Sequence, residues 1–119
     1  MIAPKPFRGE VWQVRLDPIE GHEQAGTRPA VVVSEDRYNQ GPAEMIVILP
    51  ITGTQRNVSY HVPVAPPEGG LTKQSFVMCD QIRAISTKRL IRRLGQMTPQ
   101  TMTAIEIRLR PLLHLPTRP

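Results

Sequence analysis

The sequence predicts a mainly β fold: a small, strongly curved barrel or sandwich of about six short strands, followed by one C-terminal helix. Thirteen prolines and eight glycines are spread along 119 residues and separate short apolar runs. This spacing is typical of short strands rather than long helices. The clearest helical periodicity lies after Thr98. The pattern alone does not distinguish an SH3-like barrel from other small barrels.

The length of 119 residues predicts one domain, spanning residues 1–119, with an ordered core of about residues 7–113. A chain of this size buries about two-thirds of its unfolded surface. The single cysteine, Cys79, excludes an intramolecular disulfide and suits a reducing compartment. The sequence lacks a signal-peptide pattern and any apolar run near the roughly twenty residues that span a membrane. We therefore expect a soluble, cytoplasmic protein without membrane contact.

Five segments have strand patterns. The first alternates, with Trp12, Val14 and Leu16 on one face. The second segment, Ala30–Ser34, and the third, Met45–Leu49, are almost wholly apolar, as strands buried on both faces are. The fifth segment, Ser75–Ile85, is the longest. A turn is expected at residues 68–70. The five segments are Glu10–Leu16, Ala30–Ser34, Met45–Leu49, His61–Val64 and Ser75–Ile85.

Two helical segments are expected near the C-terminal end. Ser86 and Thr87 can cap a single turn that reaches Leu90 or Ile91. Thr98 and Pro99 suit the N-cap and first position of a longer helix, which Pro111 should end or bend. The apolar residues that repeat at a helical period in this segment are Met102, Ile105 and Leu109.

Basic residues gather in the last third of the chain. Residues 1–82 contain 7 Lys/Arg against 9 Asp/Glu, whereas residues 83–119 contain 8 Lys/Arg against 1 acid. A basic part of a compact domain is typical of a protein that binds a polyanion. A solubilising surface, or a surface for an acidic protein, is an equal alternative. The chain has only five aromatic residues, fewer than a stacking platform for single strands would use.

A long polar loop separates the first two strands. A minimal hairpin needs roughly two to five loop residues, and this segment is longer and bracketed by Gly21 and Gly26. Polar loops on a rigid scaffold often carry binding or catalysis. The charged and amide side chains gathered here are Glu20, His22, Glu23, Gln24 and Arg28.

The sequence lacks the common motifs for a metal site, a phosphate-binding loop and a serine-hydrolase nucleophile. His22, His61 and His114 lie far apart, and Cys79 has no partner at a zinc-finger spacing. The chain also lacks a P-loop and a Gly-x-Ser-x-Gly elbow. We therefore expect no cofactor and no metal.

Arg28 and Thr52 are the candidates with the clearest chemistry. Arg28 precedes Pro29 at the start of a buried strand, and its planar guanidinium suits bidentate phosphate binding. Alternatively, it forms a structural salt bridge with Glu20 or Glu23. Thr52 ends an apolar run, where its hydroxyl can face a ligand or bond its own backbone in a turn. Other polar residues that could join them are His22, Gln24, Thr54, Gln55, Arg56, His61 and Gln81.

Four sequence blocks resemble the MazF/PemK family of toxins. They are residues 9–14 (GEVWQV), 21–29 (GHEQAGTRP, followed by a valine-rich strand), 51–52 (IT) and 80–83 (DQIR). The second block is specific, whereas each of the others alone would be weak. The resemblance covers about residues 7–113 in one continuous order.

The resemblance implies an SH3-like barrel of the CcdB/MazF type that forms homodimers. It also implies a toxin that cleaves single-stranded RNA, such as mRNA, at short sequences without a metal. A cognate antitoxin, acidic and partly disordered, would block it. By position, Arg28 and Thr52 match the family's catalytic residues, while Glu23 and Gln24 match its mobile loop. His22 departs from the family pattern, where a small polar residue is expected.

The resemblance also implies an RNA site around the loops at the barrel mouth. We expect Glu23 to be the third catalytic residue, as proton acceptor, with His22 as its alternative. Two other functions stay open: a non-catalytic CcdB-like toxin that acts on a protein such as DNA gyrase, and a nucleic-acid-binding barrel that uses the basic residues. The expected RNA-binding residues are His22, Gln24, Thr54, Gln55, Arg56, Gln81 and Arg83.

Overall fold

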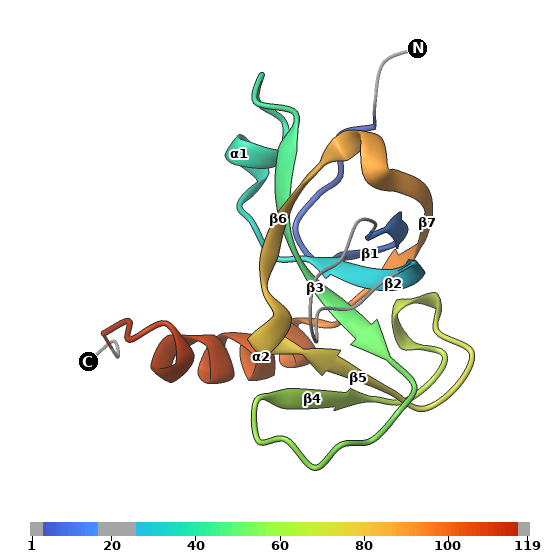
Figure 1. Ribbon diagram of the computed structural model, residues 1–119, viewed down its shortest axis with the longest axis vertical. Helices are drawn as coiled ribbons and strands as arrows, with labels where there is room; N and C mark the ends of the chain where they lie inside the picture. Colours follow the sequence, from blue (N-terminus) through green and yellow to red (C-terminus); the bar gives the residue numbers. More distant parts are fainter. Residues whose placement is uncertain (1–3, 17–25, 117–119) are drawn as a thin grey trace.

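The computed structural model describes residues 4–16 and 26–116, and its strands pair antiparallel throughout (Figure 1). The sheet order is β4–β5–β3–β2–β1–β7, with β6 also paired to β3. The mainly β prediction with a C-terminal helix is therefore confirmed. The strands are β1 (Glu10–Arg15), β2 (Thr27–Val32), β3 (Met45–Thr52), β4 (His61–Val64), β5 (Ser75–Met78), β6 (Arg83–Ser86) and β7 (Leu90–Gln96). The helices are α1 (Asp36–Asn39) and α2 (Pro99–Leu112), with 3-10 turns η1 (Glu68–Gly70), η2 (Cys79–Gln81) and η3 (Thr87–Arg89).

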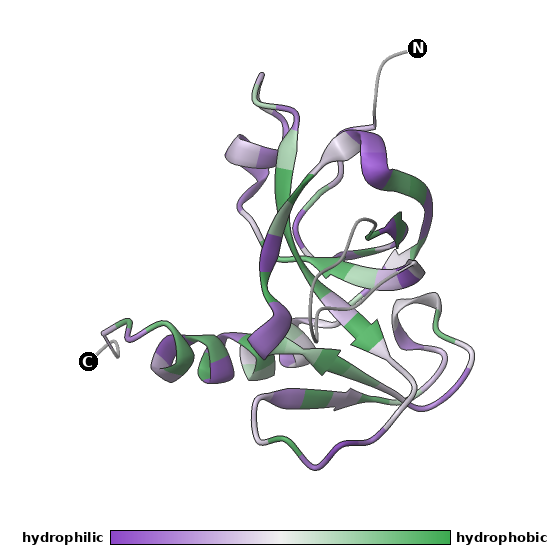
Figure 2. Ribbon diagram, viewed as in Figure 1, coloured by the Kyte–Doolittle hydropathy of each residue, from purple (hydrophilic) through white to green (hydrophobic). Residues whose placement is uncertain are grey.

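The central strand β3 contributes to two hydrophobic clusters. Leu49 and Ile51 belong to the cluster that also contains Ile105 of α2. Ile46 and Ile48 belong to the second cluster, which is formed with β1, β2 and β6. Figure 2 shows β3 as hydrophobic along most of its length. Burial on both faces explains why this segment is almost wholly apolar, as the sequence predicted.

The strand β1 alternates as the sequence predicted, and buried residues lie on both of its faces. Val14 and Leu16 lie in the second cluster, as one apolar face would require. Val11, expected on the opposite face, is 0% exposed and lies in the first cluster. The pairing of β1 with β7 shifts register between Val11 and Trp12 and again between Gln13 and Val14.

The segment predicted as one long strand, Ser75–Ile85, is divided by a turn. Both β5 and β6 pair with β3. The pairs Ile51–Val77 and Ile48–Arg83 are three residues apart along β3 but six residues apart along the segment that contains β5 and β6. The three extra residues form η2. A period-2 pattern does not reveal such an interruption, because the apolar alternation continues through it.

Two elements were missing from the sequence prediction. The strand β7 is mostly exposed and carries Arg92 and Arg93, so it lacks an apolar alternation. It forms because its backbone pairs with β1, and charged side chains are typical of an edge strand. The helix α1 has only four residues, and its Asn39 is buried.

The helix α2 begins as predicted. Thr98 is the N-cap, and its Oγ1 accepts a hydrogen bond from the Thr101 backbone N–H at 3.2 Å. Met102 and Ile105 are buried in the first cluster. Pro111 lies inside the last turn, and the helix ends one residue later at Leu112. None of the helices among the described residues is long and apolar enough to cross a membrane.

Glu68 of η1 stabilises the start of α2 and gives a pH-dependent prediction. Its Oε2 accepts hydrogen bonds from the Thr98 backbone N–H at 3.0 Å and from Thr98 Oγ1 at 3.1 Å. Burial acts to raise the pKa of Glu68, but hydrogen bonds from Thr101 and Thr98 outweigh it and lower the pKa below its ordinary 4.5. The folded state therefore favours the carboxylate, and this stabilisation is lost as the pH falls through the folded-state pKa.

We expect Glu68→Gln to lower the free energy of unfolding by about 1 kcal/mol at neutral pH. The difference between wild type and variant should shrink as the pH falls below 4.5, because the wild-type carboxylate then becomes protonated. Urea denaturation of both proteins across this pH range measures the difference. A difference that stays constant with pH would contradict the proposed role of the carboxylate.

Candidate functional site

Arg28 and Thr52 lie at the ends of neighbouring strands. In the β2–β3 register, Ala30 is opposite Pro50 and Val32 is opposite Ile48. Extending this register by two residues places Arg28 opposite Thr52. Both residues line one pocket of about 170 Å³ at this end of the sheet. The pocket is lined by Thr27, Arg28, Pro29, Ile51, Thr52, Gly53, Leu71, Thr72, Lys73 and Ser75.

The Thr52 hydroxyl is held in place by the turn that follows β3. Thr52 is 4% exposed, and its Oγ1 accepts a hydrogen bond from the Thr54 backbone N–H at 3.1 Å. The turn-forming alternative from the sequence is therefore correct. It does not conflict with a ligand contact, because accepting that bond leaves the hydroxyl hydrogen available for donation.

Arg28 is half-buried, and its backbone pairs with Val14 of β1. A side chain fixed at its base by two neighbouring strands can present its guanidinium to the pocket. The carboxylates named as alternative partners, Glu20 and Glu23, lie outside the described residues. So do the predicted site residues His22 and Gln24.

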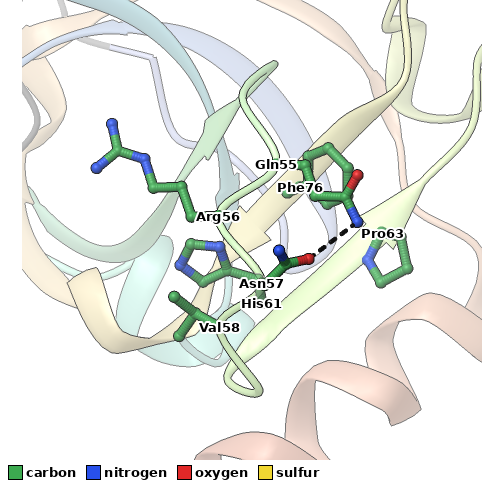
Figure 3. A pocket seen from close by; sticks show the side chains of 7 residues that line it. All are labelled: Gln55, Arg56, Asn57, Val58, His61, Pro63 and Phe76. Atoms are coloured by element: carbon green, nitrogen blue, oxygen red, sulfur yellow. Dashed lines mark hydrogen bonds between the residues drawn. The ribbon is translucent and has the colours of Figure 1, made fainter.

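The loop after β3 lines a second pocket of about 170 Å³. Figure 3 shows the side chains of this loop, β4 and β5 around one hollow, with Gln55 Nε2 donating to Asn57 Oδ1 at 3.4 Å. The pocket combines apolar walls with amide, guanidinium and imidazole groups. Its residues are Gln55, Arg56, Asn57, Val58, His61, Pro63 and Phe76.

His61 is fixed by two contacts. Its ring Nε2 lies 3.2 Å from Asp80 Oδ1, and its backbone carbonyl accepts a hydrogen bond from Arg108 Nε at 3.2 Å. The residue is 9% exposed, so its imidazole forms part of the wall rather than a mobile surface group.

The two pockets are adjacent because they share a pair of neighbouring residues on the adjacent strands β3 and β5. Thr52, in the first pocket, is directly opposite Phe76, which lines the second. Side chains in such positions have Cβ atoms roughly 5 Å apart. The structure thus brings together Arg28 with Thr52, and Gln55 with Arg56, in neighbouring pockets.

Two further predicted residues lie elsewhere. Gln81 is in η2, and Arg83 begins β6, where it pairs with Ile48. Neither lines the two pockets. Lys73 and Phe76 do, although the sequence did not indicate them as site residues. Only the pairing of β5 with β3 reveals Phe76. Lys73 follows the turn that the sequence predicted at residues 68–70, but no local pattern shows that its side chain lines the pocket.

Cys79 is a buried structural residue and not a reactive thiol. It is 0% exposed, and burial raises the pKa of its thiol to about 11. Thiolate is the reactive form, so we expect a disulfide reagent to modify native protein very slowly at neutral pH. Adding denaturant should make the reaction fast and stoichiometric. Fast modification of native protein would contradict this description.

The described residues hold no cluster of three or more His, Cys, Asp or Glu side chains arranged for a metal ion. The residues that line the two pockets offer cationic, hydroxyl, amide, imidazole and apolar groups. Cations and hydroxyl donors suit an anionic ligand, and the apolar walls suit a flat ring.

Comparisons with known proteins point to a single family. The family described as "PemK-like, MazF-like toxin of type II toxin-antitoxin system" matches residues 7–113. Endoribonuclease MazF9 from Mycobacterium tuberculosis is 36% identical over 113 residues, which cover 91% of this chain and 94% of that protein.

Solved structures agree with that match. A mycobacterial endoribonuclease in complex with its cognate antitoxin is 30% identical, with a TM-score of 0.77 over 95% of this chain and 99% of that one. MazF from Deinococcus radiodurans is 25% identical, with a TM-score of 0.83 over 94% of this chain and 99% of that one.

Proposed function

The chain belongs to the PemK-like, MazF-like toxin family of type II toxin–antitoxin systems, and from this premise we propose that it cleaves single-stranded RNA in the pocket that Arg28 and Thr52 share. Members of this family are endoribonucleases, so the endoribonuclease function stands over the two non-catalytic alternatives. One observation carries the assignment of the site. Arg28 and Thr52, which lie on different strands, line the same pocket.

The chemistry of the two side chains fits a phosphodiester at the point of cleavage. A guanidinium stays charged and donates two parallel hydrogen bonds to two phosphate oxygens. We assign Arg28 to that role, where it stabilises the charge that grows on the phosphate in the transition state. Thr52 donates its hydroxyl hydrogen to the phosphate or orients the attacking group.

The proposed reaction needs no metal. The 2′-oxygen of the RNA attacks the adjacent phosphorus, forming a 2′-O–P bond while the bond from phosphorus to the 5′-oxygen breaks. Glu23 accepts the 2′-hydroxyl proton, an assignment that rests on its sequence position alone. The leaving 5′-oxygen takes up a proton, so the products are a 2′,3′-cyclic phosphate and a 5′-hydroxyl end.

The second pocket is proposed to hold a neighbouring base. Bases of single-stranded RNA are recognised by stacking and by hydrogen bonds to their exposed edges. Phe76 and Pro63 supply apolar surface, and Gln55 and Arg56 supply hydrogen-bond donors. The remaining RNA contacts are proposed from the sequence, at His22, Gln24, Thr54, Gln81 and Arg83.

A cognate antitoxin is proposed as the second partner, acidic and partly disordered before binding. Lys88 and Arg92 are exposed on the basic part of the chain, which favours an acidic segment. We also propose a homodimer in the cytoplasm. The exposed apolar residues at the end of α2 support self-association; they are Ile107, Leu113 and Leu115.

The test is cleavage of a long single-stranded RNA by the purified protein in EDTA, with the new 5′ ends mapped. We expect discrete cuts that end in a 5′-hydroxyl. An RNA with a single 2′-deoxynucleotide at one cut site should stay intact there and be cut elsewhere. Intact RNA under all conditions, or cleavage at the deoxynucleotide, would overturn the proposal.

A further inference from the structure

Lys73 places a second cationic side chain in the wall of the pocket that contains Arg28 and Thr52. It lies in the segment between η1 and β5. The Ser75 hydroxyl donates a hydrogen bond to the Lys73 carbonyl at 2.9 Å, which fixes the backbone at this point. Lys73 is exposed, so the few atoms that its side chain contacts determine where the ammonium group lies.

The end of the Lys73 side chain lies over Gly53. A Cβ atom added to Gly53 would stand 2.6 Å from Lys73 Cε and 2.8 Å from Nζ. These distances are well inside van der Waals contact. The missing side chain at Gly53 therefore makes room for the ammonium group beside Thr52.

The charge of Lys73 is not neutralised within the part of the chain that the structure describes. Its Nζ forms no ion pair with a described carboxylate, whereas Arg8 and Arg93 each have a glutamate partner at 3.0 Å. Two cationic side chains and a hydroxyl donor thus line one small pocket. This combination favours a ligand with several anionic oxygens.

We propose that Lys73 is a catalytic residue whose ammonium group contacts a non-bridging oxygen of the scissile phosphate. The inference rests on the proposed function, because it takes the Arg28–Thr52 pocket as the place of cleavage. The phosphate carries one negative charge before attack and two in the phosphorane. A second cation is therefore most valuable in the transition state, and its removal should lower kcat more than it raises KM.

The first test compares Lys73→Gln with Lys5→Gln under single-turnover and steady-state conditions. Lys5 is another exposed lysine, before β1, and lines neither pocket. We expect Lys73→Gln to lower kcat about 100-fold, Lys73→Arg to recover part of the loss, and Lys5→Gln to stay near wild type. An unchanged kcat in Lys73→Gln, or a change in KM alone, would overturn the inference.

The second test uses Gly53→Ala, which removes no charge but occupies the space of the Lys73 side-chain end. The flexible lysine can move aside, so the variant should fold. We expect Gly53→Ala to lower kcat in the wild-type background and to have almost no further effect in Lys73→Gln. Equal losses in both backgrounds would show that Gly53 does not act through Lys73, and would overturn the inference.

Arg28→Ala in the same assay separates this inference from the proposed function. If wild type cleaves RNA and Arg28→Ala does not, the proposed function holds and the Lys73 variants decide the present inference alone. If wild type leaves RNA intact, both are overturned. If Arg28→Ala cleaves normally, RNA cleavage stands, whereas the assignment of the Arg28–Thr52 pocket and the Lys73 inference that depends on it are overturned.

Discussion

Arg28→Ala is expected to lower kcat/KM for RNA cleavage by about 10³-fold and to leave the fold intact. Removing one preorganised donor of a charge-stabilising site costs about 10²–10³-fold, and a bidentate guanidinium supplies two such donors. The side chain is half-buried at the end of β2 and belongs to neither hydrophobic cluster. Its truncation therefore opens no core cavity, and the free energy of unfolding should change by less than about 1 kcal/mol.

Two controls make this expectation specific. Arg28→Lys keeps the charge but loses the planar fork, so its activity should lie between that of wild type and Arg28→Ala. Arg37→Ala removes an exposed arginine on α1, away from the pocket, and should leave cleavage unchanged. Single-turnover cleavage of a fluorescent RNA in EDTA measures all three. Activity of folded Arg28→Ala within tenfold of wild type would contradict the assignment.

The sequence indicated the family and the fold because its signals are local. The block at residues 21–29 is specific, and membership of the MazF/PemK family is confirmed by the family match and by the relatives. Short apolar runs between prolines and glycines predicted β1 to β4 within a few residues, and Thr98 with Pro99 fixed the start of α2. These signals depend on neighbouring residues, which a single sequence displays.

The features that the sequence did not reveal depend on pairing between distant segments. The strand β7 forms because β1 offers a partner, although its own pattern is polar. The turn η2 exists because β5 and β6 pair with β3 in registers that differ by three residues. Phe76 enters the site through its pairing with Thr52, and Lys73 through the space above Gly53. No local pattern encodes these contacts.

The second large effect concerns stability, and we expect Gly70→Ala to lower the free energy of unfolding by at least about 4 kcal/mol. A Cβ atom at Gly70 would overlap the Leu94 carbonyl oxygen and stand 2.6 Å from its carbonyl carbon. Both are backbone atoms of β7, so relief requires moving the backbone of η1 and that of β7 apart. A loss of this size is a large fraction of the total stability of a small domain, which is about 5–15 kcal/mol.

Because φ is positive at Gly70, the alanine substitution also adds backbone strain, and a matched variant can measure this strain separately. Gly70 has φ +72°, and Gly26 has φ +69°, but a Cβ atom at Gly26 would meet nothing within 4 Å. Gly26→Ala therefore carries the backbone strain alone, about 1–2 kcal/mol. Urea denaturation of both variants measures the difference, which reports the contact of η1 with β7. If the two variants lose equal stability, the backbone of η1 does not lie as close to β7 at Gly70 as described.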